Sequence, residues 1–257
     1  MHLEEFAEGK SLIHSLDPRI KLISFFPFIV IVAIARGLTV PSISLMASLI
    51  LISFARLHMR ALLNRLLAVN LFILFLWLIL PFSVAGKSIF TIGHLTATSE
   101  GISYALTITL KANAIVLATI ALVATIPIFR LVHALRHFKV PEKLVSLFFF
   151  CYRYISVLHE DYSALHNAMK MRAFKPTTNV HTYRGYAYLV GMLVLKSYEH
   201  SEKVYQAMLC RGFKGKFPLL DHFTHITRKD FVFFVSMIFV AACLVTLEVG
   251  KYFWRLP

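Results

Sequence analysis

The stretch NAMKMRAFKP at residues 167–176 is nearly repeated as QAMLCRGFKG at residues 206–215. Read as helix, the alanine, the methionine and the arginine of each copy lie three or four positions apart and share one face. Pro176 and Gly212 are helix-stop signals just beyond each arginine. The repeat therefore predicts two helices with the same kind of end. The copies agree at five positions, each pair 39 residues apart: Ala168 and Ala207, Met169 and Met208, Arg172 and Arg211, Phe174 and Phe213, Lys175 and Lys214.

The composition around the repeat is that of a membrane protein. Of the 257 residues, 58% are hydrophobic and 16% are charged, whereas a soluble domain is nearer half apolar and a quarter charged. The net charge of +14 does not indicate nucleic-acid binding, because such a module does not need long apolar runs. In a membrane protein, a basic surplus reflects Lys and Arg held on the cytoplasmic side. We therefore expect a lipid bilayer, and no nucleic acid, among the partners.

Apolar runs predict an all-α membrane protein with about five transmembrane helices. A span needs about 20 residues. Three runs meet or nearly meet that length, and the first two are shorter and predict a short helical hairpin, with a re-entrant pair as the alternative. Two weaker runs, 144–158 with Arg153 inside it and 186–195, predict helices at the interface or beneath the bundle. The five stronger runs lie at 20–35, 40–55, 66–85, 101–128 and 231–249.

The distribution of basic residues predicts the topology and the domains. With the N-terminus inside, the cytoplasmic pieces and their immediate flanks hold 22 of the 27 Lys and Arg residues. We expect a multi-pass protein of a prokaryotic plasma or inner membrane with a cytoplasmic N-terminus. The predicted parts are a transmembrane bundle over 1–128, cytoplasmic coupling helices over 129–230 and a last transmembrane helix over 231–257.

The repeated patch is suited to docking. The small alanine allows close approach of another backbone, methionine adapts to an irregular groove, and arginine makes bidentate contacts with a carboxylate. The other interpretation is that the alanines and methionines belong to a core and the arginines are solvated. Two agreeing copies in the cytoplasmic part of a membrane protein favour helix-in-groove docking onto a partner with two like grooves.

The pair AMKMRAF and AMLCRGF resembles the two Ala-Arg-Gly signatures of the transmembrane T component of energy-coupling factor (ECF) transporters. The resemblance covers essentially the whole chain. The N-terminal FAEGKSLIHSLDPRIKL at 6–22 is similar to the opening of the nickel/cobalt branch, the CbiQ-like proteins, although an Asp-Pro-Arg-x-Lys stretch also opens vitamin-type T components. One position departs from the family pattern: Ala173 stands where the family usually has glycine.

The resemblance implies a role without catalysis. T components couple two cytoplasmic ABC-type ATPase subunits to a membrane-embedded substrate-binding S subunit. Carried over, Arg172 and Arg211 end the two helices that enter the ATPase grooves. ATP is then used by the partner subunits, no cofactor is bound by this chain, and the substrate is cobalt or nickel. The residues implied in ATPase coupling are Ala168, Met169, Arg172, Phe174, Ala207, Met208, Arg211, Gly212 and Phe213.

Other polar residues carry weaker signals. Lys111 and Asn113 lie within a predicted span, where an ionisable group is a functional hypothesis. They either contact the S subunit or face the bundle interior, bonded to carbonyls or to Asn70. The twelve histidines show no convergent set with Cys or carboxylates, so no metal site is predicted. No phosphate-binding Gly-rich loop is present in the sequence.

Two alternatives remain at this point. One is a shared T component that serves vitamin S subunits. The other is a membrane-embedded enzyme, which would need clustered carboxylates or a nucleophile with a base. Glu160 and Asp161 are adjacent in the coupling region, and neighbours in sequence point to different helix faces. The enzyme is therefore the less favoured alternative.

Overall fold

The computed structural model describes residues 6, 9, 11–84, 86–92, 95–138, 140–215 and 227–253. The chain forms two compact units, which are described separately. One, here called the bundle, contains the described residues of 6–131 and 227–253. The other, the coupling unit, contains those of 132–215. The boundaries predicted from the sequence at 128 and 230 remain predictions.

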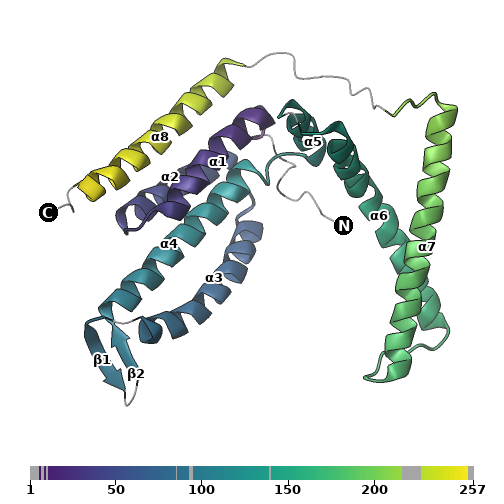
Figure 1. The fold of residues 1–257 in the computed structure, drawn as a ribbon, viewed down its shortest axis with the longest axis horizontal. Helices are drawn as coiled ribbons and strands as arrows, with labels where there is room; N and C mark the ends of the chain where they lie inside the picture. Colours follow the sequence, from purple (N-terminus) through teal and green to yellow (C-terminus); the bar gives the residue numbers. More distant parts are fainter. Residues whose placement is uncertain are drawn as a thin grey trace. The chain divides into compact units, whose positions relative to one another are not determined.

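Five helices form the bundle (Figure 1): α1 (Pro18–Ile34), α2 (Thr39–Ala55), α3 (Met59–Ser83), α4 (Ser99–Leu122) and α8 (Arg228–Phe253). Helix α4 packs on α1, α2 and α3, and α8 packs on α1 and α2. The all-α membrane class predicted from the sequence is confirmed. Three helices, α3, α4 and α8, are long and apolar enough to cross a bilayer, and α2 is a shorter apolar helix.

The first two helices are 17 residues each, about 25 Å at 1.5 Å per residue, and are shorter than a bilayer core of about 30 Å. They follow each other closely, as the predicted hairpin requires. Full crossing by this pair stays a prediction.

Small residues let the helices of the bundle approach closely. Ala114, Ala118 and Ala121 of α4 are fully buried. Ser48 of α2 donates a hydrogen bond across the interface to the Ala114 carbonyl at 3.0 Å. Close contact between small side chains drives helix association in a membrane, where lipid removes the hydrophobic driving force between helices.

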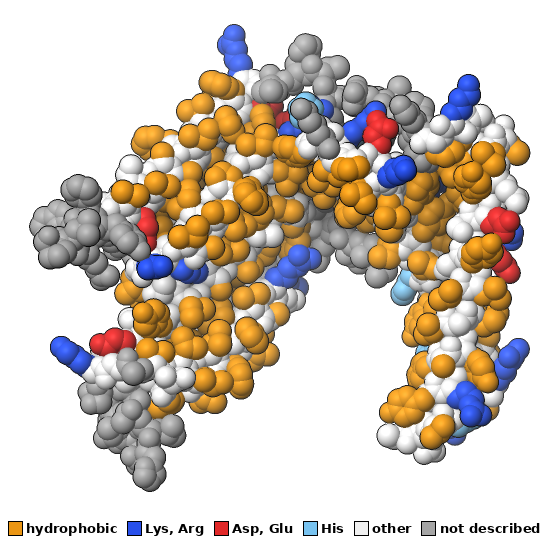
Figure 2. All heavy atoms as spheres, viewed as in Figure 1, with side chains coloured by type: hydrophobic (Ala, Val, Ile, Leu, Met, Phe, Trp, Pro, Cys, Tyr) orange, Lys and Arg blue, Asp and Glu red, His pale blue; other side chains and the backbone are white. Residues whose placement is uncertain are grey.

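The outer surface of the bundle is apolar, and Figure 2 shows hydrophobic side chains over much of one face. On α3, a continuous stripe of leucines is 59–67% exposed, comprising Leu63, Leu67, Leu71, Leu74 and Leu78. A water-soluble monomer rarely exposes so long an apolar stripe. Lipid contact explains it.

The N-terminal end of α1 is fixed by caps and charges. Asp17 accepts a hydrogen bond from the Arg19 N–H at 2.8 Å, and Pro18 occupies the first helical position. The backbone N–H of Asp17 donates to Asp230 of α8 at 2.9 Å. Lys21, which is buried, donates to Thr125 at 3.2 Å. These contacts join the start of α1 to the start of α8 and to the turn after α4.

A short antiparallel hairpin lies between α3 and α4. Strands β1 (Ser88–Ile92) and β2 (Leu95–Thr98) pair with Ile92 opposite Leu95. The apolar runs of the sequence did not predict these strands. Thr98 follows the hairpin as the N-cap of α4, where its side chain accepts from the Gly101 N–H at 3.1 Å.

The coupling unit is built on two long helices, α6 (Glu142–Met171) and α7 (Val180–Cys210), preceded by α5 (Ile128–His137). The weak apolar runs at 144–158 and 186–195 are the N-terminal parts of α6 and α7. The polar second half of each helix continues the first without a break, and a position at the interface or beneath the bundle stays a prediction. The two helices run antiparallel, as Figure 1 shows.

Candidate functional site

The two copies of the repeat close α6 and α7 with the same hydrogen bonds. In the first copy, the N–H of Phe174 donates to the Met169 carbonyl at 3.1 Å, and the N–H of Ala173 donates to Lys170 at 3.0 Å. In the second copy, Phe213 donates to Met208 at 3.1 Å and Gly212 donates to Leu209 at 2.9 Å. This paired pattern is the Schellman motif. Arg172 and Arg211 are the C-cap residues.

Both motifs require a left-handed residue directly after the arginine. Gly212 takes φ +77° and Ala173 takes φ +59°. Glycine adopts this region without penalty, whereas an alanine is strained by roughly 1–2 kcal/mol. The departure of Ala173 from the family pattern therefore leaves the geometry of the helix end unchanged.

Corresponding side chains of the two copies have the same degree of exposure to solvent. The alanines, Ala168 and Ala207, are exposed, and so are the arginines Arg172 and Arg211. The half-buried positions also correspond: Met169 and Met208 are both half-buried, and so are Phe174 and Phe213. The surface offered to a partner thus consists mainly of the small residue and the cation, while the methionine and the phenylalanine also pack within the unit.

Phe174 anchors the first helix end on α7. Its ring lies edge-on to Tyr186, with 5.6 Å between centroids, and 6.4 Å from His181. A β-carbon at Gly185 would come within 2.7 Å of the Phe174 ring and 3.5 Å of the Met169 methyl group. The glycine therefore allows the close approach of the end of α6 to the start of α7.

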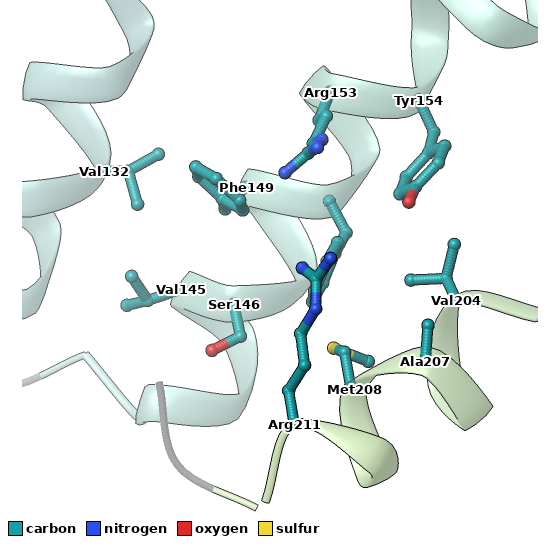
Figure 3. Close-up of a pocket in the computed structure, with 11 residues that line it drawn as sticks. Val132, Val145, Ser146, Phe149, Arg153, Tyr154, Val204, Ala207, Met208 and Arg211 are labelled. Carbon is teal, nitrogen blue, oxygen red and sulfur yellow. The ribbon is translucent and has the colours of Figure 1, made fainter. Parts of the chain in front are cut away.

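The second helix end meets the start of α6 at a pocket of about 470 Å³. Figure 3 shows the guanidinium groups of Arg153, from α6, and Arg211, from the end of α7, both directed into this space. Val145, Phe149 and Met208 form part of its apolar wall. Two convergent guanidinium groups over an apolar wall favour an anionic, carboxylate-sized occupant.

The contacts at the two ends are related by the spacing of the repeat. Met169 lies beside Gly185, and Met208 lines the same pocket as Ser146. Gly185 follows Ser146 by the 39 positions that separate the two methionines. Asp161 and His200 are also 39 positions apart, and they bind each other at 3.2 Å. The helix pair therefore has an internal two-fold relation, with Asp161 and His200 at its centre.

This arrangement puts the two arginines at opposite ends of the helix pair. Helix α6 has 30 residues, so the two ends are on the order of 40 Å apart. The residues of the two copies form two separate, equivalent surfaces and not one composite site.

At the centre of the pair, Asp161 is held by two partners on α7, Lys196 and His200. The Lys196 ammonium donates to Asp161 at 2.9 Å, and His200 completes the cluster. The hydrogen bond from Lys196 is the main reason that the pKa of Asp161 lies below its usual value, and the positive charges of Lys196 and His200 act in the same direction. This carboxylate, considered above for an enzyme, has a structural partner on the neighbouring helix.

Lys111 and Asn113 are bonded within the bundle. The Lys111 ammonium donates to the Ala33 carbonyl of α1 at 2.9 Å. The amides of Asn113 and Asn70 donate to each other at 3.0 and 3.1 Å. These bonds supply the internal partners that the sequence analysis considered, and contact with an S subunit stays a prediction.

Arg153 lines the pocket at the second helix end but was not among the site residues predicted from the sequence. Its signal was present, since a charged residue inside an apolar run is costly unless it meets an anion or water. Among the described residues, no group of three His, Cys, Asp or Glu side chains is placed to hold a metal ion.

Known proteins resemble the chain over nearly its full length. A family model described as the cobalt transport protein CbiQ matches residues 9–222. An uncharacterized protein of Methanocaldococcus jannaschii is 26% identical over 96% of this chain and 86% of its own. The energy-coupling factor transporter transmembrane protein EcfT of Bacillus subtilis is 27% identical over 96% of this chain and 98% of its own. A putative fused cobalt transport protein, CbiMQ, of Methanocorpusculum labreanum is 28% identical over 48% of this chain and 21% of its own.

Proposed function

The chain belongs to the CbiQ family of cobalt transport proteins, and we propose that it is the coupling subunit of an ATP-driven ECF-type importer. In this proposal, α6 and α7 transmit the motion of two cytoplasmic ABC-type ATPase subunits to a membrane-embedded S subunit that binds the substrate. The chain itself hydrolyses nothing. The observation that carries the proposal is the pair of matching helix ends, each with an exposed arginine after an exposed alanine.

The two-fold relation within the coupling unit supports a partner with two equivalent grooves. A dimer of like subunits has a two-fold axis and presents every groove twice. A helix pair whose contacts repeat at a spacing of 39 residues complements such a dimer. Each ATPase subunit then receives one helix end, and its closure moves both ends together.

The chemistry at each end suits an acidic groove. Arg172 and Arg211 are exposed and lie directly at a helix terminus, where a planar guanidinium can form two parallel bonds with one carboxylate. At the second end, Arg153 adds a guanidinium to the same pocket. We therefore propose that an acidic side chain of an ATPase enters the pocket between Arg153 and Arg211.

The proposed substrate is cobalt or nickel, which the description of the matched family supports. The alternative is a shared T component for vitamins, since relatives named EcfT carry no metal in their names. In both cases a separate S subunit selects the substrate, and we propose Lys111 and Asn113 as its contacts. The proposed topology keeps the N-terminus and the coupling unit in the cytoplasm.

The test of coupling is uptake of labelled cobalt and nickel, with ATP hydrolysis measured on the purified complex. Arg172→Ala and Arg211→Ala should each lower uptake and transport-linked hydrolysis, because each removes one partner of a desolvated charge pair. Arg→Lys at either position should restore part of the loss, since lysine keeps the charge without the planar fork. Parental uptake and hydrolysis in both alanine variants would contradict the proposal.

The test of substrate selection is calorimetry on the purified chain with cobalt or nickel. We expect no stoichiometric, submicromolar site, because a separate subunit is proposed to select the metal. One tight site on the isolated chain would contradict that division of labour.

A further inference from the structure

A polar pocket lies at the end of the bundle where α2 finishes and α8 begins. Its volume is about 620 Å³. Two cations, Arg56 and Lys229, line it, together with three serines and two apolar residues, namely Ser11, Ser15, Ser53, Leu12 and Phe54. Among the described residues that line it there is no carboxylate, so the charge of this lining favours an anion.

The polar pocket continues into an apolar groove between α2 and α8. The groove has a volume of about 670 Å³ and shares Leu12, Phe54 and Lys229 with the polar pocket. Farther along, its walls include Ile50 of α2 and Val232 of α8, which are 55% and 66% exposed. The groove therefore opens onto the apolar outer surface of the bundle, where lipid is the surrounding solvent.

Three cations line the two connected cavities, and one of them, Lys229, lines both. Arg56 and Lys229 line the polar pocket, and Arg228 and Lys229 line the groove. None of the three forms an ion pair with another described residue. The nearest acid in sequence, Asp230, is turned to the backbone, where it accepts from the N–H groups of Asp17 and Thr227 at 2.9 Å each.

The placement of these cations is locally unfavourable. Arg228 and Lys229 open α8, and cations at a helix N-terminus oppose the helix dipole. Arg56 takes φ +46°, a left-handed conformation that is unfavourable for a residue with a β-carbon. An anion bound between the three side chains would offset both costs.

We propose that this junction binds one anionic phospholipid, with its phosphate among Arg56, Arg228 and Lys229 and an acyl chain in the groove between α2 and α8. A free phosphate would use only the polar pocket and leave the groove unexplained. A purely apolar helix would fill the groove and leave the three cations unpaired. An anionic lipid matches both cavities and reaches them from the bilayer.

The test is native mass spectrometry of the full chain, purified in detergent with equal amounts of phosphatidylglycerol and phosphatidylcholine. The parental chain should retain one phosphatidylglycerol in preference to phosphatidylcholine. Arg56→Gly with Lys229→Gln should lower that retention about 25-fold, at roughly fivefold per basic residue near an anionic headgroup. Glycine suits the positive φ of residue 56, so this variant loses charge without added backbone strain.

Two further variants distinguish the contributions of the groove and of the three cations to lipid binding. Ile50→Trp fills the groove and leaves every charge in place, and it should also lower phosphatidylglycerol retention. The control Arg36→Gln with Arg60→Gln removes two exposed cations outside the junction and should retain lipid as the parental chain does. Equal retention of both lipids, parental retention in the Arg56 and Lys229 variant, or displacement of the lipid by millimolar inorganic phosphate alone would each overturn the proposal.

Discussion

At the scale of single residues, the end of α6 depends on one strained alanine. Ala173 takes φ +59° where the matching position, Gly212, takes φ +77°. We predict that Ala173→Gly stabilises the coupling unit by about 0.5–1 kcal/mol, since relief of the left-handed strain exceeds the greater freedom of glycine in the unfolded chain. Hydrogen exchange of the amides of α6 in the full chain measures this change.

The opposite substitution in the second copy is the matched control. Gly212→Ala should destabilise the end of α7 by a similar amount. If both substitutions shift exchange in the same direction, the equivalence of the two helix ends is wrong.

Gly185 supports the packing of the first helix end. A methyl group there would meet the Phe174 ring at 2.7 Å, so we predict that Gly185→Ala lowers the free energy of unfolding by about 1–3 kcal/mol through overpacking. Thermal unfolding in detergent measures the loss. Phe174→Leu in the same chain should recover part of it.

Gly191 provides a control on the same helix. Among the described residues, no atom lies within 4 Å of a β-carbon at this position. Gly191→Ala should therefore raise stability by roughly 0.5–1 kcal/mol, as expected for alanine in an exposed helix interior. A loss at Gly191 equal to that at Gly185 would mean that helix propensity, and not contact with Phe174, determines the effect.

At the scale of elements, α6 and α7 are joined at their centre by Asp161, Lys196 and His200. The pKa of Asp161 is lower in the folded chain than in the unfolded chain, chiefly because Lys196 donates a hydrogen bond to it. Its contribution to stability is therefore present above the unfolded pKa of about 4 and is lost as the pH falls through the folded pKa. Asp161→Asn should lower the melting temperature at pH 6, and the difference from the parental chain should shrink as the pH falls below 4.

The adjacent carboxylate is the control for this titration. Glu160 is exposed and forms no ion pair with any described residue. Glu160→Gln should leave the melting temperature nearly unchanged from pH 6 to pH 3. A pH-independent loss in Asp161→Asn would show that the side chain acts by packing alone.

The sequence predicts some elements well and others poorly. The length of the apolar runs alone predicted α3, α4 and α8, because a run of about 20 apolar residues is typical of a transmembrane helix. The same criterion failed for α6 and α7, whose second halves are polar and are stabilised by contact with each other. The hairpin of β1 and β2 was not predicted, because residues 88–98 are too few to give a clear alternation of apolar and polar residues.

The site was predictable residue by residue but not as an arrangement. The repeat identified Arg172 and Arg211, and its stop signals located the helix ends. The antiparallel packing that separates the two arginines is a tertiary property, and no local pattern encodes it. For the same reason, the sequence indicated only that Arg153 is energetically unfavourable within an apolar run. The pocket that it lines with Arg211 depends on the packing of α6 against α7.

At the scale of the whole molecule, the distribution of Lys and Arg predicts which side each part occupies. A reporter active only in the cytoplasm should be active when fused after Phe174, between α6 and α7, and silent when fused at Ser88, in β1. The sequence offers a second cytoplasmic position at Lys216, which lies outside the described residues. Activity at Ser88 together with silence at Phe174 would contradict the topology.

The central claim is that two equivalent helix ends hold one pair of ATPase subunits, with one end bound to each subunit. Truncating one partner of a buried charge pair costs about 2–5 kcal/mol. With one end lost, the other still holds the complex, and its contact makes rebinding effectively intramolecular. Loss of both ends should therefore reduce assembly far more than either single loss.

The most direct measurement is the amount of ATPase that co-purifies with the tagged chain. Arg172→Ala and Arg211→Ala should each retain much of it, whereas the double variant should retain little while folding and inserting normally. Arg36→Ala with Lys87→Ala, which removes two exposed cations of the bundle, should retain the parental amount. Parental co-purification in the Arg172→Ala and Arg211→Ala double variant would contradict the account.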